Sequence, residues 1–348
     1  MAKWTSTDDT ASVVPFVKID SCQQLEETFQ FGEKLGEGAF GSVLLALRIS
    51  DGHKFAVKKM VKKKDPKTQY GKSWENEIHV LSRHRHPNIV AVDAIYESEN
   101  SCYLFMELCD GGNLADELQR RTRFAEQDAR CTLRQLGSAL SYLHRHRVVH
   151  RDLKLHNCLL KRIPSAKTTD GSSPRFCRRR GEAAVDRKGS PATHPCPFVV
   201  KLTDFGLSIE LRVSDQSLGD NVGTPAYQAP EIVKCSSYTE KCDVWSLGII
   251  MFSLVHGSLP YSSRSESDLI DEIKDFNYGR LCSRCKTCSE LSAECRAALS
   301  HLLVQSAVDR WSTSEFMDSA WVTEKSGGAR EGNILAMMRD VNRTTKDK

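Results

Sequence analysis

The eight residues HRDLKLHN, His150 to Asn157, carry side chains suited to proton and phosphoryl chemistry. Asp152 follows an arginine and precedes Lys154, so its carboxylate should stay ionised and could accept or orient a hydroxyl proton. Lys154 could steady transferred phosphoryl oxygens. Asn157 and Asp204, the latter in TDFG, offer the hard oxygen ligands that magnesium prefers.

A second candidate is the glycine-rich stretch GEGAFGSV, Gly36 to Val43. A strand–turn–strand containing glycines can fold its backbone amides over phosphates, because no Cβ blocks close approach. The dinucleotide-binding version of this motif needs a helix to open at Gly41, whereas Val43 to Leu47 has strand character. By itself the motif fits a phosphate-binding hairpin and a plain hairpin turn equally well.

Lys58, in FAVKK, lies among apolar residues of a predicted strand. Burying an unpaired ammonium is costly, so a buried lysine here needs an acid. Glu77, on the next predicted helix, is the natural partner. The alternative is a lysine on the surface.

These residues are distributed over two kinds of predicted structure. Strands are predicted at 31–35, 42–48, 54–59, 89–96 and 102–107, with a helix at 71–83. Beyond Asp110-Gly111-Gly112 the chain becomes helical. One apolar helix face is formed there by Ala129, Leu133, Leu136, Leu140 and Leu143.

In chain order the motifs are G-x-G-x-x-G-x-V, A-V-K, H-R-D-L-x-x-x-N, D-F-G and A-P-E, the last at Ala229 to Glu231. This set resembles the eukaryotic protein kinases, across roughly Phe31 to Val322. Lys154 and GTPAYQAPE resemble the Ser/Thr class, and DVWSLGIIMFSLVHGSLPY is most similar to the calcium/calmodulin-dependent kinase group. The resemblance implies an α+β, bilobal protein kinase fold over 30–323, with a small β-rich N-lobe (30–107) and a larger helical C-lobe (110–323).

The resemblance also implies an ATP-dependent kinase that transfers the γ-phosphoryl group to Ser/Thr hydroxyls of protein substrates, with ATP and Mg²⁺ as cofactors. Asp152 would be the catalytic base, Lys154 the γ-phosphate contact and Thr224 the neighbour of both. Lys58, paired with Glu77, would bind the α- and β-phosphates, and Asn157 and Asp204 would hold magnesium. The implied ATP-binding residues are Gly36, Glu37, Gly38, Ala39, Phe40, Gly41, Val43, Ala56, Lys58, Met106, Glu107, Cys109 and Leu159.

Two structural anchors are implied in the same way. Glu231 and Arg310 match the buried ion pair of the family's large lobe, and Asp243 matches its helix anchor. A pseudokinase, which binds partners without catalysis, is the main alternative. Such proteins usually lose the lysine, the catalytic aspartate or the metal-binding aspartate, and this sequence keeps all three.

Departures from the family pattern bear on the substrate. Kinases that favour basic residues before the target carry acids at three positions, which here are Asn113, His156 and Ser253. We therefore expect no strong demand for arginine upstream of the target residue.

A further departure concerns activation. Asp220 stands four residues before Thr224, where many kinases carry an activating phosphorylated residue, and its carboxylate could pair with Arg151. Basal activity would then not depend on phosphorylation of this segment. The alternative is a solvated loop acid.

Three segments have the composition of flexible or accessory chain. We expect a flexible lead-in at 1–29 and a disordered basic insertion at 161–197, which is either a solvated loop or a docking or phosphorylation segment. The tail 324–348 resembles the start of the regulatory helix of calcium-regulated kinases, which can block the substrate cleft or bind calmodulin. A helix merely packed on the large lobe is the alternative.

Thirteen cysteines and no secretory signal suggest reduced thiols in a cytoplasmic or nuclear protein. Cys282, Cys285, Cys288 and Cys295 form a C-x2-C-x2-C-x6-C pattern that could bind zinc, with unliganded thiols as the alternative. A net charge of +4 is too weak to indicate nucleic-acid binding, and no apolar run is long enough to span a membrane.

Overall fold

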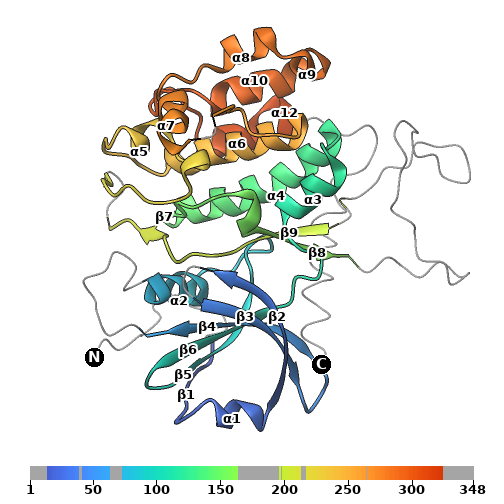
Figure 1. The fold of residues 1–348 in the computed structure, drawn as a ribbon, viewed down its shortest axis with the longest axis vertical. Helices are drawn as coiled ribbons and strands as arrows, with labels where there is room; N and C mark the ends of the chain where they lie inside the picture. Colours follow the sequence, from blue (N-terminus) through green and yellow to red (C-terminus); the bar gives the residue numbers. More distant parts are fainter. Residues whose placement is uncertain are drawn as a thin grey trace, which may run out of the picture.

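The computed structural model describes residues 14–38, 41–62, 73–163, 196, 198–212, 217–263 and 265–323. A sheet-rich lobe is followed along the chain by a larger helical lobe (Figure 1). The predicted α+β bilobal architecture is therefore confirmed.

The small lobe is one six-stranded sheet in the order β1-β5-β6-β4-β3-β2. Helix α2 (Ser73–Arg83) lies on the side of the sheet nearest the large lobe (Figure 1). The strands, with the short helix α1 (Gln23–Glu26), are β1 (Phe16–Lys18), β2 (Phe29–Gly38), β3 (Gly41–Arg48), β4 (Lys54–Val61), β5 (Val92–Glu97) and β6 (Ser101–Glu107).

Strand β4 shows how the sequence separates the two faces of this sheet. Phe55 and Val57 pack with Phe29 and Phe105 in an aromatic core, where the Phe29 and Phe105 ring centroids are 4.4 Å apart. Because side chains alternate along a strand, Lys58 belongs to the opposite face. The alternation in FAVKK thus turns Lys58 away from the aromatic core.

The predicted flexible lead-in is wrong for residues 14–29. Strand β1 pairs in parallel with β5, with Phe16 opposite Ile95. Val14 and Leu25 are buried in the small lobe, at 5% and 2% exposure. Burial of these apolar side chains and the strand pairing stabilise this segment, although its polar composition predicts flexible chain.

The large lobe is built around α6 (Lys241–His256), whose residues from Cys242 to Val255 are all buried. Its burial accounts for the apolar run from Val244 to Val255. Helix α4 (Glu126–Arg145) packs its predicted apolar face inward. The remaining elements are α3 (Leu114–Arg121), β7 (Val148–Val149), η1 (Leu155–Asn157), β8 (Cys158–Arg162), β9 (Phe198–Leu202), β10 (Ile209–Glu210), η2 (Pro225–Tyr227), α5 (Pro230–Val233), α7 (Glu266–Lys274), α8 (Tyr278–Arg284), α9 (Lys286–Glu290), α10 (Ala293–Leu302), α11 (Thr313–Asp318) and α12 (Ala320–Thr323).

The basic insertion begins later than predicted. Lys161 and Arg162 belong to β8, which pairs antiparallel with β9 and places Arg162 opposite Phe198. The Lys161 ammonium also lies 2.7 Å from a Glu107 carboxylate oxygen, which holds it in the fold. Residues 164–195 and 197, like the tail 324–348, lie outside the described residues.

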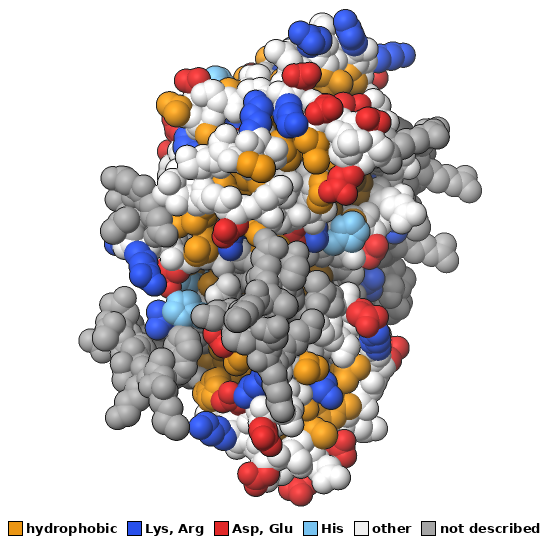
Figure 2. All heavy atoms as spheres, turned by 60° about the vertical axis from the view of Figure 1, so that its left-hand side comes forward, with side chains coloured by type: hydrophobic (Ala, Val, Ile, Leu, Met, Phe, Trp, Pro, Cys, Tyr) orange, Lys and Arg blue, Asp and Glu red, His pale blue; other side chains and the backbone are white. Residues whose placement is uncertain are grey.

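The surface carries mixed charge on the face that Figure 2 shows, where acidic and basic side chains are interspersed over both lobes. Among the helices that the structure describes, none combines the length and apolar character needed to cross a membrane.

Candidate active site

An ion cluster joins the two lobes at Lys58. Its ammonium donates to both carboxylate oxygens of Glu77, at 2.8 and 2.7 Å, and to Asp204 at 3.1 Å. Lys58 and Glu77 are buried, at 6% and 0% exposure. Burial alone would lower the pKa of Lys58, but the carboxylates of Glu77 and Asp204 outweigh it and raise that pKa. The predicted partner of Lys58 is therefore in contact with it, and the lysine stays charged.

A second cluster centres on Asp152. Its Oδ1 accepts hydrogen bonds from the Thr224 backbone N–H at 2.9 Å and from the Thr224 hydroxyl at 2.7 Å. Its Oδ2 accepts from the Lys154 ammonium at 2.7 Å, and Lys154 also donates to the Thr224 Oγ1 at 2.8 Å. Three residues separated by up to 72 positions thus form one closed network.

Asn157 completes this network. Its Nδ2 donates to the Asp152 carbonyl at 2.8 Å and to the Asp152 carboxylate at 3.2 Å. Because the amide nitrogen makes both bonds, the amide oxygen is the atom left to bind a metal ion. Asp204 contributes a carboxylate that is 29% exposed. The pair supplies hard oxygen donors, so the residues fit magnesium.

Asp243, inside α6, holds the backbone that carries Asp152. Its carboxylate accepts from the backbone N–H groups of His150 and Arg151, at 2.8 and 2.9 Å, and from the His144 ring at 2.9 Å. Burial opposes ionisation, but the hydrogen bonds and charges of His144 and His150 outweigh it and hold the pKa of Asp243 below its usual value. The predicted helix anchor is present, and His144 is a partner that the motif spacing did not indicate.

This anchoring maintains a strained backbone. Arg151 has φ 66° and Asp204 has φ 65°, in the left-handed region that non-glycine residues rarely adopt. Such a conformation costs on the order of 1–3 kcal/mol and persists only where surrounding contacts impose it. Gly223 packs so closely that a Cβ there would lie 2.4 Å from the Arg151 carbonyl oxygen.

Four of the predicted nucleotide-binding residues, Val43, Ala56, Lys58 and Met106, share one face of the small-lobe sheet, whereas Glu107 lies opposite Phe55 on the other face. In the register, Val43 lies opposite Lys58, and Ala56 lies opposite Met106. Directly opposed residues of neighbouring strands point to the same face. The face of the sheet that carries Lys58 therefore also carries Val43, Ala56 and Met106, three of the predicted ATP-binding residues.

The glycine-rich hairpin joins β2 to β3, with Gly36 opposite Val43. Gly41 has φ 155°, and a Cβ there would lie 1.9 Å from the Lys59 carbonyl oxygen, so only glycine fits. The Glu37 side chain is exposed and pairs with Lys34. Gly38 ends β2, and the predicted contacts Ala39 and Phe40 lie outside the described residues.

The segment that joins the lobes is locked to β8. The Gly111 N–H donates to the Leu160 carbonyl at 2.7 Å, and Asn113 forms a bridge with Leu159. The Glu107 side chain binds Lys161 and Lys201, at 2.7 and 2.6 Å. The sequence did not indicate these lysine partners. Because both lysines bind the Glu107 carboxylate, this side chain has a structural role.

At Cys109, in the same segment, burial raises the pKa of the thiol to about 12. The thiol therefore stays protonated and uncharged near neutral pH.

The family model described as "Protein kinase domain" matches residues 29–322. The chain belongs to the protein kinase family. The mouse protein named serine/threonine-protein kinase 33 is 32% identical over 342 residues, covering 97% of this chain and 64% of the mouse protein. This chain thus spans slightly less than two thirds of that relative's length.

Two further relatives show the breadth of the likeness. A Dictyostelium discoideum protein named as a probable myosin light chain kinase is 28% identical, covering 87% of this chain and 69% of that protein. The human hormonally up-regulated neu tumor-associated kinase is 33% identical, covering 86% of this chain and 37% of that protein. These relatives confirm the predicted resemblance to Ser/Thr kinases of the calcium/calmodulin-dependent group.

The kinase domain contains the expected ion pair of the large lobe. The Arg310 guanidinium donates to both carboxylate oxygens of Glu231, at 2.7 and 2.9 Å. Arg310 also stacks over the Trp245 ring at 5.2 Å. Glu231 ends the activation segment, residues 204–231, so this pair attaches the end of that segment to the large-lobe core.

Arg151 and Asp220 are in contact, as the sequence predicts. An Arg151 Nη1 donates to Asp220 at 3.2 Å, and Arg151 Nε donates to the Leu207 carbonyl at 2.7 Å. Tyr238, which the sequence did not indicate, donates to the Asp220 carbonyl at 2.9 Å. Arg151 thereby bridges two parts of the activation segment.

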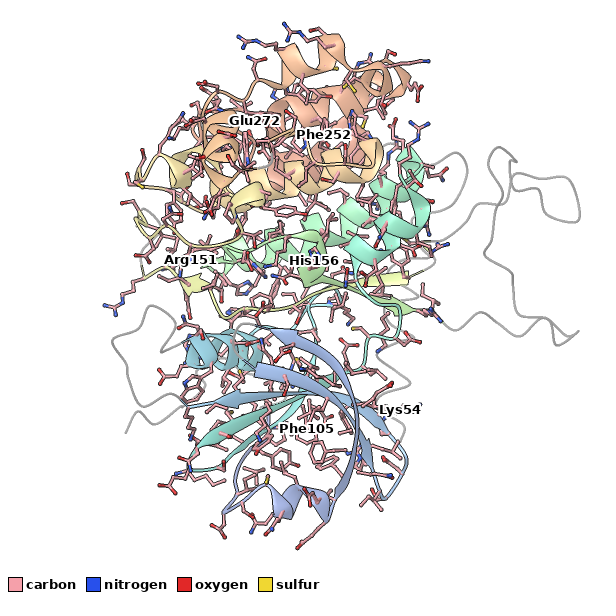
Figure 3. The ribbon with its side chains drawn as sticks, viewed as in Figure 1. Lys54, Phe105, Arg151, His156, Phe252 and Glu272 are labelled. Carbon is pink, nitrogen blue, oxygen red and sulfur yellow. The ribbon has the colours of Figure 1, made fainter. Side chains whose placement is uncertain are left out.

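The three positions without acids differ in environment. Asn113 caps α3 by accepting from the backbone N–H groups of Ala115 and Asp116. His156 is exposed, and it lies with Arg151 on the side of the large lobe that faces the small lobe (Figure 3). Ser253 is buried and donates to the Ile249 carbonyl within α6. His156 is therefore the accessible position of the three.

Proposed function

We propose that this chain is an active ATP-dependent serine/threonine protein kinase. The observation that carries the proposal is the joint presence of two intact clusters, Lys58–Glu77–Asp204 and Asp152–Lys154–Thr224. Positioning and electrostatic stabilisation supply most of the catalysis in phosphoryl transfer, so both clusters must be formed at once.

The chain's residues divide the work. The Asp152 carboxylate orients the substrate hydroxyl and accepts its proton, while Lys154 and Thr224 hold that carboxylate from two sides. Lys58, held by Glu77, binds the nucleotide phosphates. Mg²⁺ held by Asn157 and Asp204 would neutralise charge on the phosphates.

A pseudokinase remains the alternative. The similarity to relatives establishes the kinase domain but does not test catalytic activity, so it is compatible with a pseudokinase. Against it, a scaffold has no need to maintain a strained Arg151 or a closed network at Asp152. Measured phosphoryl transfer distinguishes the two functions.

Replacing Asp152 by Asn tests the proposal. The amide keeps the side-chain shape but cannot accept the hydroxyl proton, so phosphoryl transfer from radiolabelled ATP should fall about 10²- to 10⁴-fold. The exposed Asp93 on β5 provides the matched control, and Asp93→Asn should keep the wild-type rate. Wild-type transfer no higher than that of Asp152→Asn would leave the pseudokinase ahead.

We propose further that basal activity does not require phosphorylation of the activation segment. The Asp220 carboxylate already occupies Arg151, the side chain that an activating phosphate would pair with. Asp220 is 66% exposed, so solvent screening limits the strength of this pair.

Phosphatase-treated protein should therefore keep its activity, and Asp220→Ala should lower it about two- to fivefold, as expected for an exposed ion pair. Radiolabel transfer to a generic protein substrate is the measurement, with Asp93→Ala as the control. Loss of activity on phosphatase treatment, or an Asp220→Ala variant at the wild-type rate, would contradict the proposal that Asp220 takes the place of an activating phosphate.

Substrate selection follows from the missing acids. Without a carboxylate at Asn113, His156 or Ser253, the protein has no negative charge at these positions to attract an upstream arginine. We propose that this kinase accepts targets lacking upstream arginines.

A peptide array checks this selectivity. Wild-type protein should show no strong selection for upstream arginine, and His156→Glu should introduce one, because position 156 is exposed. Ser300→Glu, exposed on α10, adds the same charge elsewhere and should change nothing. Strong arginine selection by the wild type would overturn the proposal.

Partners and compartment remain predictions. Calmodulin binding is predicted for the tail around Ile334 to Val341, outside the described residues. A cytoplasmic or nuclear location is predicted from the cysteines, without a specific nucleic-acid partner.

A further inference from the structure

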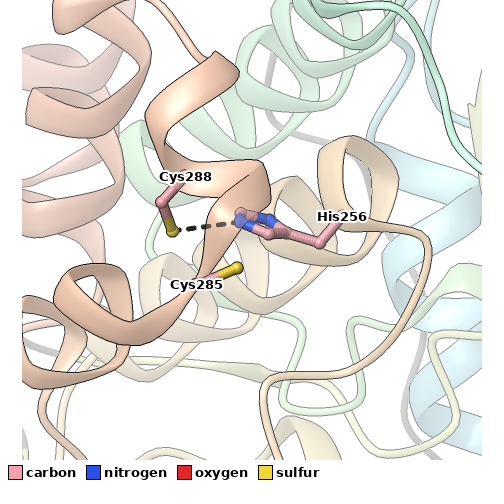
Figure 4. A group of neighbouring side chains, drawn as sticks. All are labelled: His256, Cys285 and Cys288. Carbon is pink, nitrogen blue, oxygen red and sulfur yellow. Dashed lines mark hydrogen bonds between the residues drawn. The ribbon is translucent and has the colours of Figure 1, made fainter.

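Three potential metal ligands converge at the far end of α6 from the active site. His256 ends α6, Cys285 links α8 to α9, and Cys288 lies in α9. Their ligand atoms all lie within 4.8 Å of one another, and His256 Nε2 is 3.3 Å from the Cys288 Sγ (Figure 4). Both cysteines are free thiols.

The His256 ring is oriented as a metal ligand requires. Its Nδ1 lies 3.0 Å from the Phe252 carbonyl oxygen, and a carbonyl only accepts, so Nδ1 carries the proton. In the neutral ring the other nitrogen, Nε2, then carries the lone pair, and this atom faces the Cys288 Sγ. Metal-bound histidines commonly donate their other ring N–H to a backbone carbonyl in this way.

Packing fixes the same orientation. The His256 and Phe252 rings are stacked, with centroids 3.7 Å apart and planes 7° from parallel. The ring therefore has little freedom to turn away from the cysteines.

A third thiol lies beside this group. Cys282 is a free cysteine in α8, three residues before Cys285, and it interacts with the Cys288 thiol. It lies outside the set whose ligand atoms are all within 4.8 Å of one another, so it has to move toward them to become a fourth ligand. A divalent metal deprotonates coordinating thiols and so can draw a neighbouring cysteine into its ligand set.

The sequence pattern included Cys295 in this set, and the structure corrects that choice. Cys295 is buried on α10 and does not belong to the group formed by His256, Cys285 and Cys288. The ligand that replaces it, His256, lies far upstream in the sequence, so cysteine spacing could not reveal it.

We propose that His256, Cys285 and Cys288, with Cys282 as the fourth ligand, bind Zn²⁺ and tie the α8–α9 segment to α6. One imidazole and three thiolates make a Cys₃His set, which zinc prefers in structural sites. Bonds of about 2.3 Å to sulfur and about 2.0 Å to nitrogen place ligand atoms roughly 3.5–3.8 Å apart. The group of His256, Cys285 and Cys288 therefore needs only a small contraction, and Cys282 has to approach it to complete the set.

The charge balance is compatible with this assignment. Three thiolates and Zn²⁺ sum to one negative charge, and binding releases the three thiol protons to solvent. Arg123 interacts with His256 but is itself paired with Glu290 at 2.9 Å, whereas Arg284 and Lys286 flank Cys285 in the chain. Arg284 and Lys286 are therefore the cations that offset the negative charge of the filled site.

The proposal is tested by measuring the zinc content of the full chain. The protein is expressed with added zinc, purified under reductant and dialysed against EDTA before the measurement. The wild type should retain about one zinc per chain, and Cys288→Ser should bind zinc about 10²-fold more weakly or not at all. Cys235→Ser removes an exposed cysteine elsewhere in the large lobe and should keep the metal.

Cobalt substitution gives a second readout. Co²⁺-loaded protein should show the near-ultraviolet thiolate charge-transfer band, weaker in Cys282→Ser because one thiolate is lost. Should Cys288→Ser fail to fold, His256→Gln and the effect of a zinc chelator on wild-type thermal unfolding decide the question. A wild type without zinc, zinc content unchanged in folded Cys288→Ser or His256→Gln, or zinc loss in Cys235→Ser would each contradict the proposal.

Discussion

The contact on which the site depends is the ion cluster of Lys58, Glu77 and Asp204, in which Lys58 and Glu77 are buried and Asp204 is partly exposed. It joins β4, α2 and the start of the activation segment, three elements that share no local sequence. Breaking such a buried pair by removing one partner typically costs about 3–5 kcal/mol. That cost applies to the Lys58–Glu77 pair, which lies within the small lobe, while the bond to Asp204 connects Lys58 to the large lobe. Lys58, which we propose to bind phosphates, therefore lies where the two lobes meet.

In the large lobe, a buried charged side chain, Asp243, likewise fixes the position of active-site residues. A single buried carboxylate accepts two backbone N–H groups and a histidine, and so imposes the left-handed backbone of Arg151. Phe205, beside Asp204, packs on the His150 ring with centroids 4.9 Å apart. The loop that contains Arg151 and the ion cluster at Lys58 are therefore in contact through Phe205 and His150. We expect a substitution in either to change the position of Asp152.

The sequence predicts residues whose chemistry depends on local spacing. Asp152, Lys154 and Asn157 lie close together in the sequence, within residues 152–157, and Lys58 lies in a strand with a clear alternating pattern. The secondary structure that positions these four residues could therefore be predicted. Contacts made across the fold could not. His144 at Asp243 and His256 at the cysteines are brought in by helix packing, and the pairing of β1 with β5 depends on a partner strand far along the chain.

The most direct test of the central claim is the kcat/KM for ATP in Glu77→Gln. The amide keeps the side-chain shape but removes the charge that holds Lys58, so kcat/KM should fall about 10²-fold, the effect of displacing a positioning group. Glu75→Gln, an exposed neighbour on α2, should retain the wild-type value. A Glu77→Gln variant with wild-type kcat/KM would show that the active site does not depend on this ion cluster.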